Sequence, residues 1–136
     1  MSEVRVLETS LYVDDVARAS EFYRSLFGFE AMIEDHRFCA LSVAGKQVLL
    51  LFKKGSSTSV TVVPGGDIPP HDGAGELHLA FAIPADALAG WEARLAAQDI
   101  AIESRVSWER GGQSIYFRDP DTNLVELVTP GCWPIY

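Results

Sequence analysis

The stretch LYVDDVARASEFYRSLFGFE, residues 11–30, decides the fold. It opens on apolar strand-like residues, and Asp15 can cap a helix that begins near Val16. Gly28 stands where a helix stop is expected. Between them, apolar side chains recur at helical spacing on one face, at Ala19, Phe22, Tyr23, Leu26 and Phe27. The stretch therefore predicts a strand, a helix and the start of the next strand.

The rest of the chain continues this order and then repeats it. A strand over 4–13 precedes the helix, and strands over 29–34, 38–43 and 46–52 follow it. The second half predicts a strand over 75–84, a helix over 85–99 and strands over 100–106, 113–119 and 123–129. The sequence VLLLFKKG (48–55) lies over LVELVTPG (124–131) when the halves are aligned. We conclude that the chain duplicates a βαβββ unit.

The two halves are joined by a segment rich in Ser, Gly and Pro, KGSSTSVTVVPGGDIPPHDGAG (54–75). It is long for a structureless connection, so it is a linker or a working loop, and VTVV adds a short strand. The expected organisation is one structural domain with a first βαβββ module over 1–56, a linker over 57–74 and a second module over 75–136 that ends in an aromatic tail.

Composition limits the classes of partner. The chain has 136 residues, 48% of them hydrophobic, and a net charge of −8, which argues against nucleic acid because phosphates would be repelled. The longest apolar runs are too short to span a membrane, and the charged start MSEVRV does not read as a signal peptide. With two cysteines and no disulfide pattern, a reduced cytoplasmic protein is expected.

Three stretches are informative together: the opening stretch, LHLAF (77–81) and YFRDPDTNLVEL (116–127). They resemble the vicinal oxygen chelate superfamily, which includes glyoxalase I, bleomycin resistance proteins, fosfomycin-resistance enzymes and extradiol dioxygenases, and such a protein acts on a small-molecule substrate or ligand. The resemblance implies an α+β fold in which two tandem βαβββ modules form curved mixed sheets around a funnel-shaped site, with the helices on the outer face. It also implies a divalent metal ion in the funnel and a homodimer, in which modules often pair across subunits and share the sites.

The same resemblance places metal ligands in the first and fourth strands of each module. In this chain these positions are Glu8 and His78 in the first strands, and Leu50 and Glu126 in the fourth. Because Leu50 cannot bind a metal, the candidate triad is Glu8, His78 and Glu126. Strand alternation independently turns the three ionisable groups to the sheet face opposite the larger apolar set. Such a donor set suits Mn, Fe, Zn, Ni or Mg.

Other residues are candidates for contact with the substrate. Tyr116 shares a face with Glu126 if their strands pair in the family register, which makes Tyr116 and Glu126 the candidate catalytic residues. The candidate substrate-binding residues are Tyr12, His71, Arg105 and Trp108. Arginines in a loop are more often solvated, and His71 more often belongs to a surface turn. In RDPDTN (118–123), Thr122 stands where the family more often has Gly, so Asn123 is expected to supply any left-handed conformation.

The ligand pattern separates several functions. Glyoxalase I has a Glu at the position of Leu50, so the chain is not expected to be glyoxalase I proper. Glu8 stands where dioxygenases and fosfomycin transferases have His, and the added negative charge would weaken the metal as a Lewis acid. The first hypothesis is a metal-dependent lyase, isomerase or ring-cleaving enzyme acting on adjacent oxygens. The alternatives are a non-catalytic, bleomycin-resistance-like binding protein and a diverged scaffold whose carboxylates only form hydrogen bonds.

Overall fold

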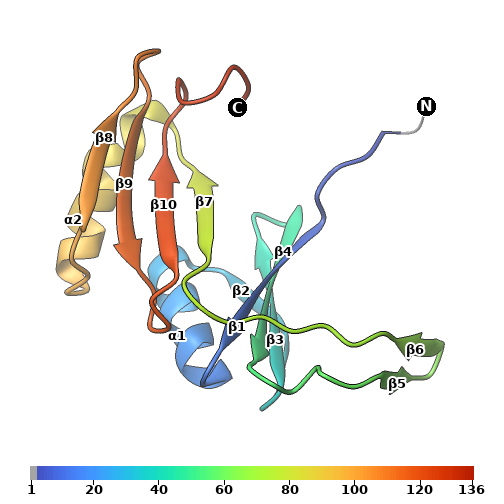
Figure 1. Ribbon diagram of the computed structural model, residues 1–136. Helices are drawn as coiled ribbons and strands as arrows, with labels where there is room; N and C mark the ends of the chain where they lie inside the picture. Colours follow the sequence, from blue (N-terminus) through green and yellow to red (C-terminus); the bar gives the residue numbers. More distant parts are fainter. Residues whose placement is uncertain (1–2) are drawn as a thin grey trace. The chain divides into compact units, whose positions relative to one another are not determined.

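The structure, a computed structural model, describes residues 3–136, and the chain divides into two compact units between Ala74 and Gly75 (Figure 1). The first unit contains β1 (Glu8–Val13), α1 (Val16–Phe27), β2 (Glu30–Glu34), β3 (Phe38–Val43), β4 (Gln47–Lys53), β5 (Thr61–Val63) and β6 (Gly66–Ile68). The second contains β7 (His78–Ala82), the short 3-10 helix η1 (Ala85–Ala87), α2 (Leu88–Ala97), β8 (Ser104–Ser107), β9 (Gln113–Arg118) and β10 (Leu124–Val128). The α+β class and the repeated βαβββ order are confirmed.

Helix α1 begins and ends where its sequence predicts. The Asp15 carboxylate accepts a 3.1 Å hydrogen bond from the backbone N–H of Arg18, which satisfies one of the unpaired donors of the first turn. Gly28 follows the last turn with a φ of 73°, and its N–H bonds the Arg24 carbonyl at 2.9 Å. Glycine adopts this left-handed conformation without a Cβ clash, so the helix stops there.

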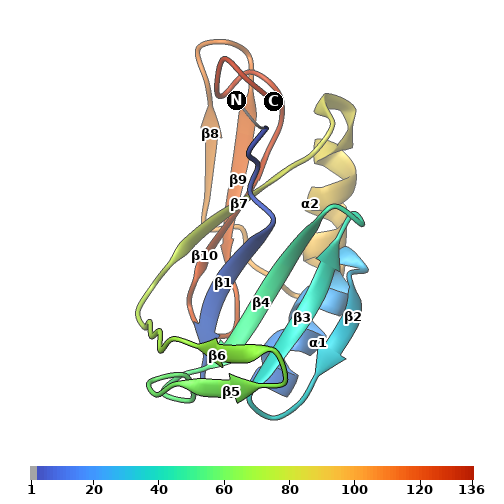
Figure 2. The same ribbon diagram turned by 90° about the vertical axis from the view of Figure 1, so that its right-hand side faces the viewer.

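The first unit has a four-stranded sheet with α1 on one face. The strand order is β1-β4-β3-β2, with β1 parallel to β4 and the other pairs antiparallel. Alternate residues on the α1 side are fully buried, among them Leu11, Val13, Cys39, Leu41, Leu49 and Leu51. Figure 2 shows the β5–β6 hairpin crossing in front of the sheet, on the face away from α1. Glu8, Ser10 and Tyr12 project to this second face, as alternation predicts.

The second unit repeats the pairing of β1, β4 and β3 residue by residue in β7, β10 and β9. Its sheet has the order β7-β10-β9-β8, with β7 parallel to β10. Glu8 pairs with Val48 in the first sheet, and His78 pairs with Leu124 in the second. Moving two residues along β4 and β10 from these partners gives Leu50 and Glu126. The backbone register thus confirms the internal repeat on which the predicted ligand positions depend.

Several boundaries and one turn differ from the sequence-based expectations. Strands β1, β7 and β8 begin three to four residues later than expected. The segment 57–74 contains a second strand, β6, and belongs to the first unit.

Thr122, not Asn123, takes the left-handed conformation in the turn before β10, with a φ of 65°. Asn123 is fully buried: its amide donates to Asp119 at 3.0 Å and its Oδ1 accepts from the Leu77 N–H at 3.0 Å. These side-chain bonds fix the Asn123 backbone and leave the strained position to Thr122.

In residues 3–136 no helix is both long enough and apolar enough to cross a membrane.

Candidate functional site

Four side chains of the second unit form a continuous polar chain centred on Glu126. This residue lies in the middle of β10 with 6% of its surface exposed. Its Oε1 lies 3.1 Å from His78 Nε2, and its Oε2 accepts a 2.5 Å hydrogen bond from the hydroxyl of Ser114. The indole N–H of Trp108 donates to Ser114 Oγ at 2.8 Å. Because a buried carboxylate without partners is costly, these contacts are what makes Glu126 tolerable inside the sheet.

The backbone orients the imidazole of His78. Its Nδ1 lies 3.0 Å from the carbonyl oxygen of Leu124. A carbonyl oxygen only accepts, so Nδ1 carries a proton and donates to it. Nε2, the nitrogen that faces Glu126, then either carries the second proton of an imidazolium or offers its lone pair beside the carboxylate. A carbonyl partner on the outer nitrogen is the usual way in which proteins orient a metal-binding histidine.

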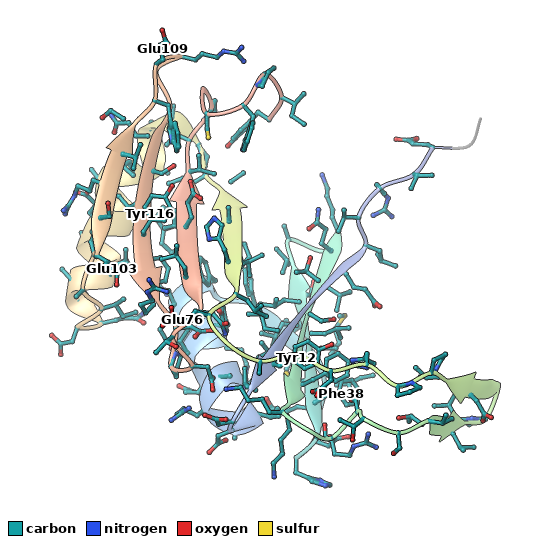
Figure 3. The ribbon with its side chains drawn as sticks, viewed as in Figure 1. Tyr12, Phe38, Glu76, Glu103, Glu109 and Tyr116 are labelled. Carbon is teal, nitrogen blue, oxygen red and sulfur yellow. The ribbon has the colours of Figure 1, made fainter. Side chains whose placement is uncertain are left out.

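Tyr116 lies beside this polar chain. The antiparallel register of β9 and β10 pairs it directly with Glu126, so the two strands have the register that the family resemblance implied. Figure 3 shows Tyr116 on β9. The rings of Tyr116 and His78 have their centroids 6.2 Å apart. Burial, and after it the negative charge of the Glu126 carboxylate, raises the pKa of Tyr116. The phenol therefore keeps its proton to a higher pH than an ordinary tyrosine does.

The first unit has a cavity on the sheet face away from α1. Its volume is about 610 Å³, and the residues that line it include Glu8, Tyr12, Leu50 and His71. Tyr12 Oη lies 2.7 Å from His71 Nδ1, so the structure brings together two of the residues predicted to contact substrate. Glu8 is exposed, whereas Leu50 gives the position equivalent to Glu126 an apolar side chain.

Arg105 does not join the polar chain. It pairs with Ile115 across β8 and β9, and therefore lies on the sheet face opposite Ser114 and Tyr116. Its guanidinium instead bonds Glu92 of α2 at 3.1 Å. Trp108, predicted with it, does reach the cluster, but through Ser114. Among residues 3–136, no three His, Cys, Asp or Glu side chains are grouped closely enough to hold a metal ion, and the triad that adds Glu8 from the first unit to His78 and Glu126 stays a prediction.

Two parts of these sites were not anticipated from the sequence. Ser114 precedes Tyr116 by two residues, so alternation could have placed it on the same face. Arg37 and Phe52 line the cavity of the first unit. Phe52 follows Leu50 by two residues and was within reach of the same argument. Arg37 lies in a turn, where alternation gives no direction.

Comparison with known proteins places the chain in a family. The sequence profile of the Glyoxalase/Bleomycin resistance protein/Dioxygenase superfamily matches residues 5–127. The chain belongs to this superfamily, and the resemblance drawn from its motifs is confirmed. The comparison with curated proteins gives no match.

Solved structures extend the comparison. The chain is similar to a lactoylglutathione lyase from Agrobacterium tumefaciens, with 31% identity, a TM-score of 0.89, and coverage of 99% of this chain and 100% of the other. Two more distant structures share the fold. A fosfomycin resistance protein from Listeria monocytogenes has 22% identity, a TM-score of 0.66 and coverage of 95% and 93%. A glyoxalase/dioxygenase from Nostoc punctiforme has 19% identity, a TM-score of 0.66 and coverage of 92% and 90%.

Proposed function

We propose that the chain is a divalent-metal-dependent enzyme that chelates adjacent oxygens of a small substrate. The observation that carries the proposal is the 3.1 Å separation between His78 Nε2 and Glu126 Oε1. Two ligands bonded to one ion at about 2.1 Å and about 90° to each other stand about 3.0 Å apart, which is the spacing of this pair. The outer atoms of both side chains are held by Leu124 and Ser114, and the inner atoms, which contact each other in the absence of an ion, face the place where an ion would bind.

Glu8 is the third ligand of the proposal. It occupies in β1 the register position that His78 occupies in β7, and it lines a cavity. One imidazole and two carboxylates suit Mn, Fe, Zn, Ni or Mg, and three protein ligands leave positions open for a substrate. When bound, a divalent ion supplies Lewis-acid polarisation of the substrate oxygens.

The chain's own residues supply binding and proton transfer. Ser114 fixes one oxygen of Glu126 and keeps the other directed to His78. We assign Glu126 as the proton acceptor and Tyr116 as the hydrogen-bond donor, because the two residues are paired directly across β9 and β10 and the phenol is protonated at neutral pH. A substrate oxygen that gains negative charge would receive this hydrogen bond. Lyase, isomerase and ring-cleaving oxidoreductase reactions all fit these roles.

Metal binding tests the proposal without any knowledge of the substrate. Calorimetry and elemental analysis of the purified chain with Mn, Fe(II), Zn, Ni and Mg are expected to give stoichiometric binding of at least one of them. Glu8→Gln, His78→Gln and Glu126→Gln should each weaken that binding at least about a hundredfold, because each removes a ligand. Glu109→Gln removes the same charge from an exposed turn and should leave the affinity unchanged. A wild type that refuses all five metals contradicts the proposal.

Lactoylglutathione lyase activity is a second candidate, favoured by the 31% identity to the Agrobacterium tumefaciens protein of that name. Leu50 argues against it, since glyoxalase I binds its metal through four ligands and one of them is a Glu at this position. The discriminating assay is turnover of the hemithioacetal of methylglyoxal and glutathione by the metal-loaded chain. We expect none, and turnover at the rate of a dedicated enzyme would establish the second candidate instead.

A non-catalytic binding protein is the alternative that the net charge of −8 favours. It predicts tight binding of bleomycin or a similar cationic drug after treatment with EDTA, which calorimetry measures directly.

We further propose that the chain is a homodimer and that it resides in the reducing cytoplasm, where its free cysteines, Cys39 and Cys132, would persist.

A further inference from the structure

The cavity of the first unit has an aromatic floor. The register places Tyr12, Phe52 and Phe38 directly opposite one another on β1, β4 and β3. The ring of Phe52 lies 5.9 Å from that of Tyr12 and 5.8 Å from that of Phe38, with interplanar angles of 25° and 21°. His71 meets Phe52 edge-on at 4.6 Å. Tyr12 and Phe38, labelled in Figure 3, mark the two sides of this row, which offers stacking surface to a flat ligand.

The segment after β4 forms one wall of the cavity. Thr61, Val63 and Ile68 of the β5–β6 hairpin line it. The returning chain is tied down at His71, whose N–H bonds the Ser57 carbonyl at 2.9 Å. At Gly73 the backbone lies against the Tyr12 ring so closely that any Cβ would overlap ring atoms. The cavity volume of about 610 Å³ is in the range of small-molecule sites.

Arg37 supplies positive charge at the aromatic end of the cavity. The Asp35 carboxylate accepts hydrogen bonds from the backbone N–H groups of Arg37 (2.7 Å) and Phe38 (3.0 Å), which fixes the turn. Arg37 Nη2 donates to the Ser56 carbonyl at 2.7 Å, and the side chain lines the cavity. A guanidinium has five N–H donors, so donors remain for an anion. Glu8, four residues before Tyr12 on β1, gives the other end of the cavity a negative charge, about 13 Å away along the strand.

We infer that this cavity binds a flat aromatic carboxylate, with the ring on the row of Tyr12, Phe52 and Phe38 and the carboxylate on Arg37. The inference rests on the proposed function in one respect: if Glu8 is a metal ligand, the end of the bound carboxylate that lies near Glu8 carries the adjacent oxygens. The substrate class is an aryl carboxylate with its oxygen pair remote from the carboxylate. Overall the chain is acidic, so anion binding here depends on the local charge of Arg37.

A pair of probes with opposite charge tests the inference. Calorimetry on the EDTA-treated full chain compares 1-naphthoate with 1-naphthylmethylammonium, which share the naphthalene ring. We expect 1-naphthoate to bind at least about tenfold more tightly, as a charge-assisted hydrogen bond provides. Tighter binding of the ammonium probe, or no binding of 1-naphthoate at millimolar concentration, overturns the inference. This comparison uses the wild type and does not depend on the folding of a variant.

Variants then test separately the contribution of Arg37 to carboxylate binding and that of Phe52 to ring binding. Arg37→Gln should weaken 1-naphthoate binding about tenfold and abolish the preference over the ammonium probe. Arg24→Gln is the matched control: it removes the same charge from the exposed side of α1, remote from the cavity, and should change neither affinity. Phe52→Leu keeps an apolar side chain but removes the stacking ring, so both probes should weaken about fivefold. Equal effects of Arg37→Gln and Arg24→Gln would overturn the role of Arg37.

The outcomes separate this inference from the metal proposal. Because the probes are measured without metal, Arg37-dependent binding of 1-naphthoate supports the cavity's ligand class even if the chain refuses every metal. Stoichiometric metal binding without naphthoate binding leaves the proposed function standing and overturns the ligand class. Glu8→Gln should affect metal affinity and leave 1-naphthoate affinity within about twofold, since salt screens charges that are separated by more than about 10 Å.

Discussion

The hydroxyl of Ser114 joins two side chains of the second unit, since it donates to Glu126 and accepts from the Trp108 indole. Removing it leaves a carboxylate oxygen and an N–H group without their partner in a buried position. We expect Ser114→Ala to lower the free energy of unfolding by about 1–3 kcal/mol, measured by urea denaturation. Ser107→Ala, on the exposed part of β8, should change it by less than about 0.5 kcal/mol. Equal effects of the two substitutions would show that the hydroxyl contributes nothing specific.

Titration of Tyr116 follows from its surroundings. Burial and the Glu126 carboxylate raise its pKa, so the folded chain holds this phenolic proton to a higher pH than the unfolded chain does. The protonated phenol therefore contributes its full share of the free energy of unfolding below the ordinary tyrosine pKa. This contribution is lost as the pH rises through the pKa of Tyr116 in the folded chain. The difference in absorbance at 295 nm between wild type and Tyr116→Phe measures this titration.

A second substitution separates the two causes of that shift. Glu126→Gln should lower the pKa of Tyr116 only part of the way to its ordinary value, because burial is the larger cause and remains. A full return to the ordinary value in this variant would show that charge, not burial, dominates. A titration of wild-type Tyr116 at or below the ordinary value would contradict the burial argument altogether.

At the scale of elements, the turn between β9 and β10 matters most, because it leads the chain into the strand that carries Glu126. The Asp119 carboxylate accepts hydrogen bonds from the N–H groups of Asp121 and Asn123, both at 2.9 Å, and so closes the turn. Thr122 stands in this turn with a φ of 65°, which is unfavourable for a β-branched residue. Its hydroxyl bonds the Asp121 carbonyl at 2.6 Å, which offsets part of the strain.

Replacement of Thr122 by glycine should therefore stabilise the chain. We expect Thr122→Gly to raise the free energy of unfolding by about 0.5–1 kcal/mol, because glycine adopts positive φ without a Cβ clash. Thr122→Ala is the control: it loses the hydroxyl but keeps the Cβ, so it should give no gain. Thermal and urea unfolding measure both. A destabilised Thr122→Gly variant would mean that the hydroxyl bond outweighs the backbone strain.

At the scale of the whole molecule, the two units repeat one pairing pattern but differ in what that pattern holds. The row formed by Tyr12, Phe52 and Phe38 in the first unit is matched by Ala82, Val128 and Ser114 in the second. The first unit thus has a row of aromatic side chains where the second has small ones, and only the second has the polar chain around Glu126. The proposed metal site takes Glu8 from a first unit and His78 and Glu126 from a second unit. These two units can belong to one chain or to two chains.

Complementation between two inactive variants distinguishes these arrangements. Glu8→Gln and Glu126→Gln are each expected to lose metal binding. If sites are shared across the subunits of a homodimer, unfolding and refolding a mixture of the two variants creates mixed dimers with one intact site each. We expect about a quarter of the sites to bind metal again, as random pairing of two equally abundant chains gives. No recovery in a mixture that sedimentation shows to be dimeric would place the ligands within one chain.

The predictions from sequence succeeded where neighbouring residues decide the outcome. Asp15 and Gly28 fixed the ends of α1 through local hydrogen bonds and backbone conformation, and alternation placed Glu8, Ser10 and Tyr12 on one face. Boundaries of β1, β7 and β8 were less accurate, because a strand begins where its partner begins. The left-handed residue of the β9–β10 turn was misassigned, since the buried bonds of Asn123 come from residues remote in sequence.

The sequence by itself therefore determined the α+β class, the duplicated βαβββ order and the register-equivalent places of Glu8 and His78. Periodicity and capping are properties of short segments, so they can be read without a structure. Tertiary structure alone decided that Ser114 connects Trp108 to Glu126, that Arg105 turns to the helix side, and that Arg37 reaches an aromatic cavity. These contacts depend on which strands lie side by side and on where a loop returns, and no local pattern encodes either.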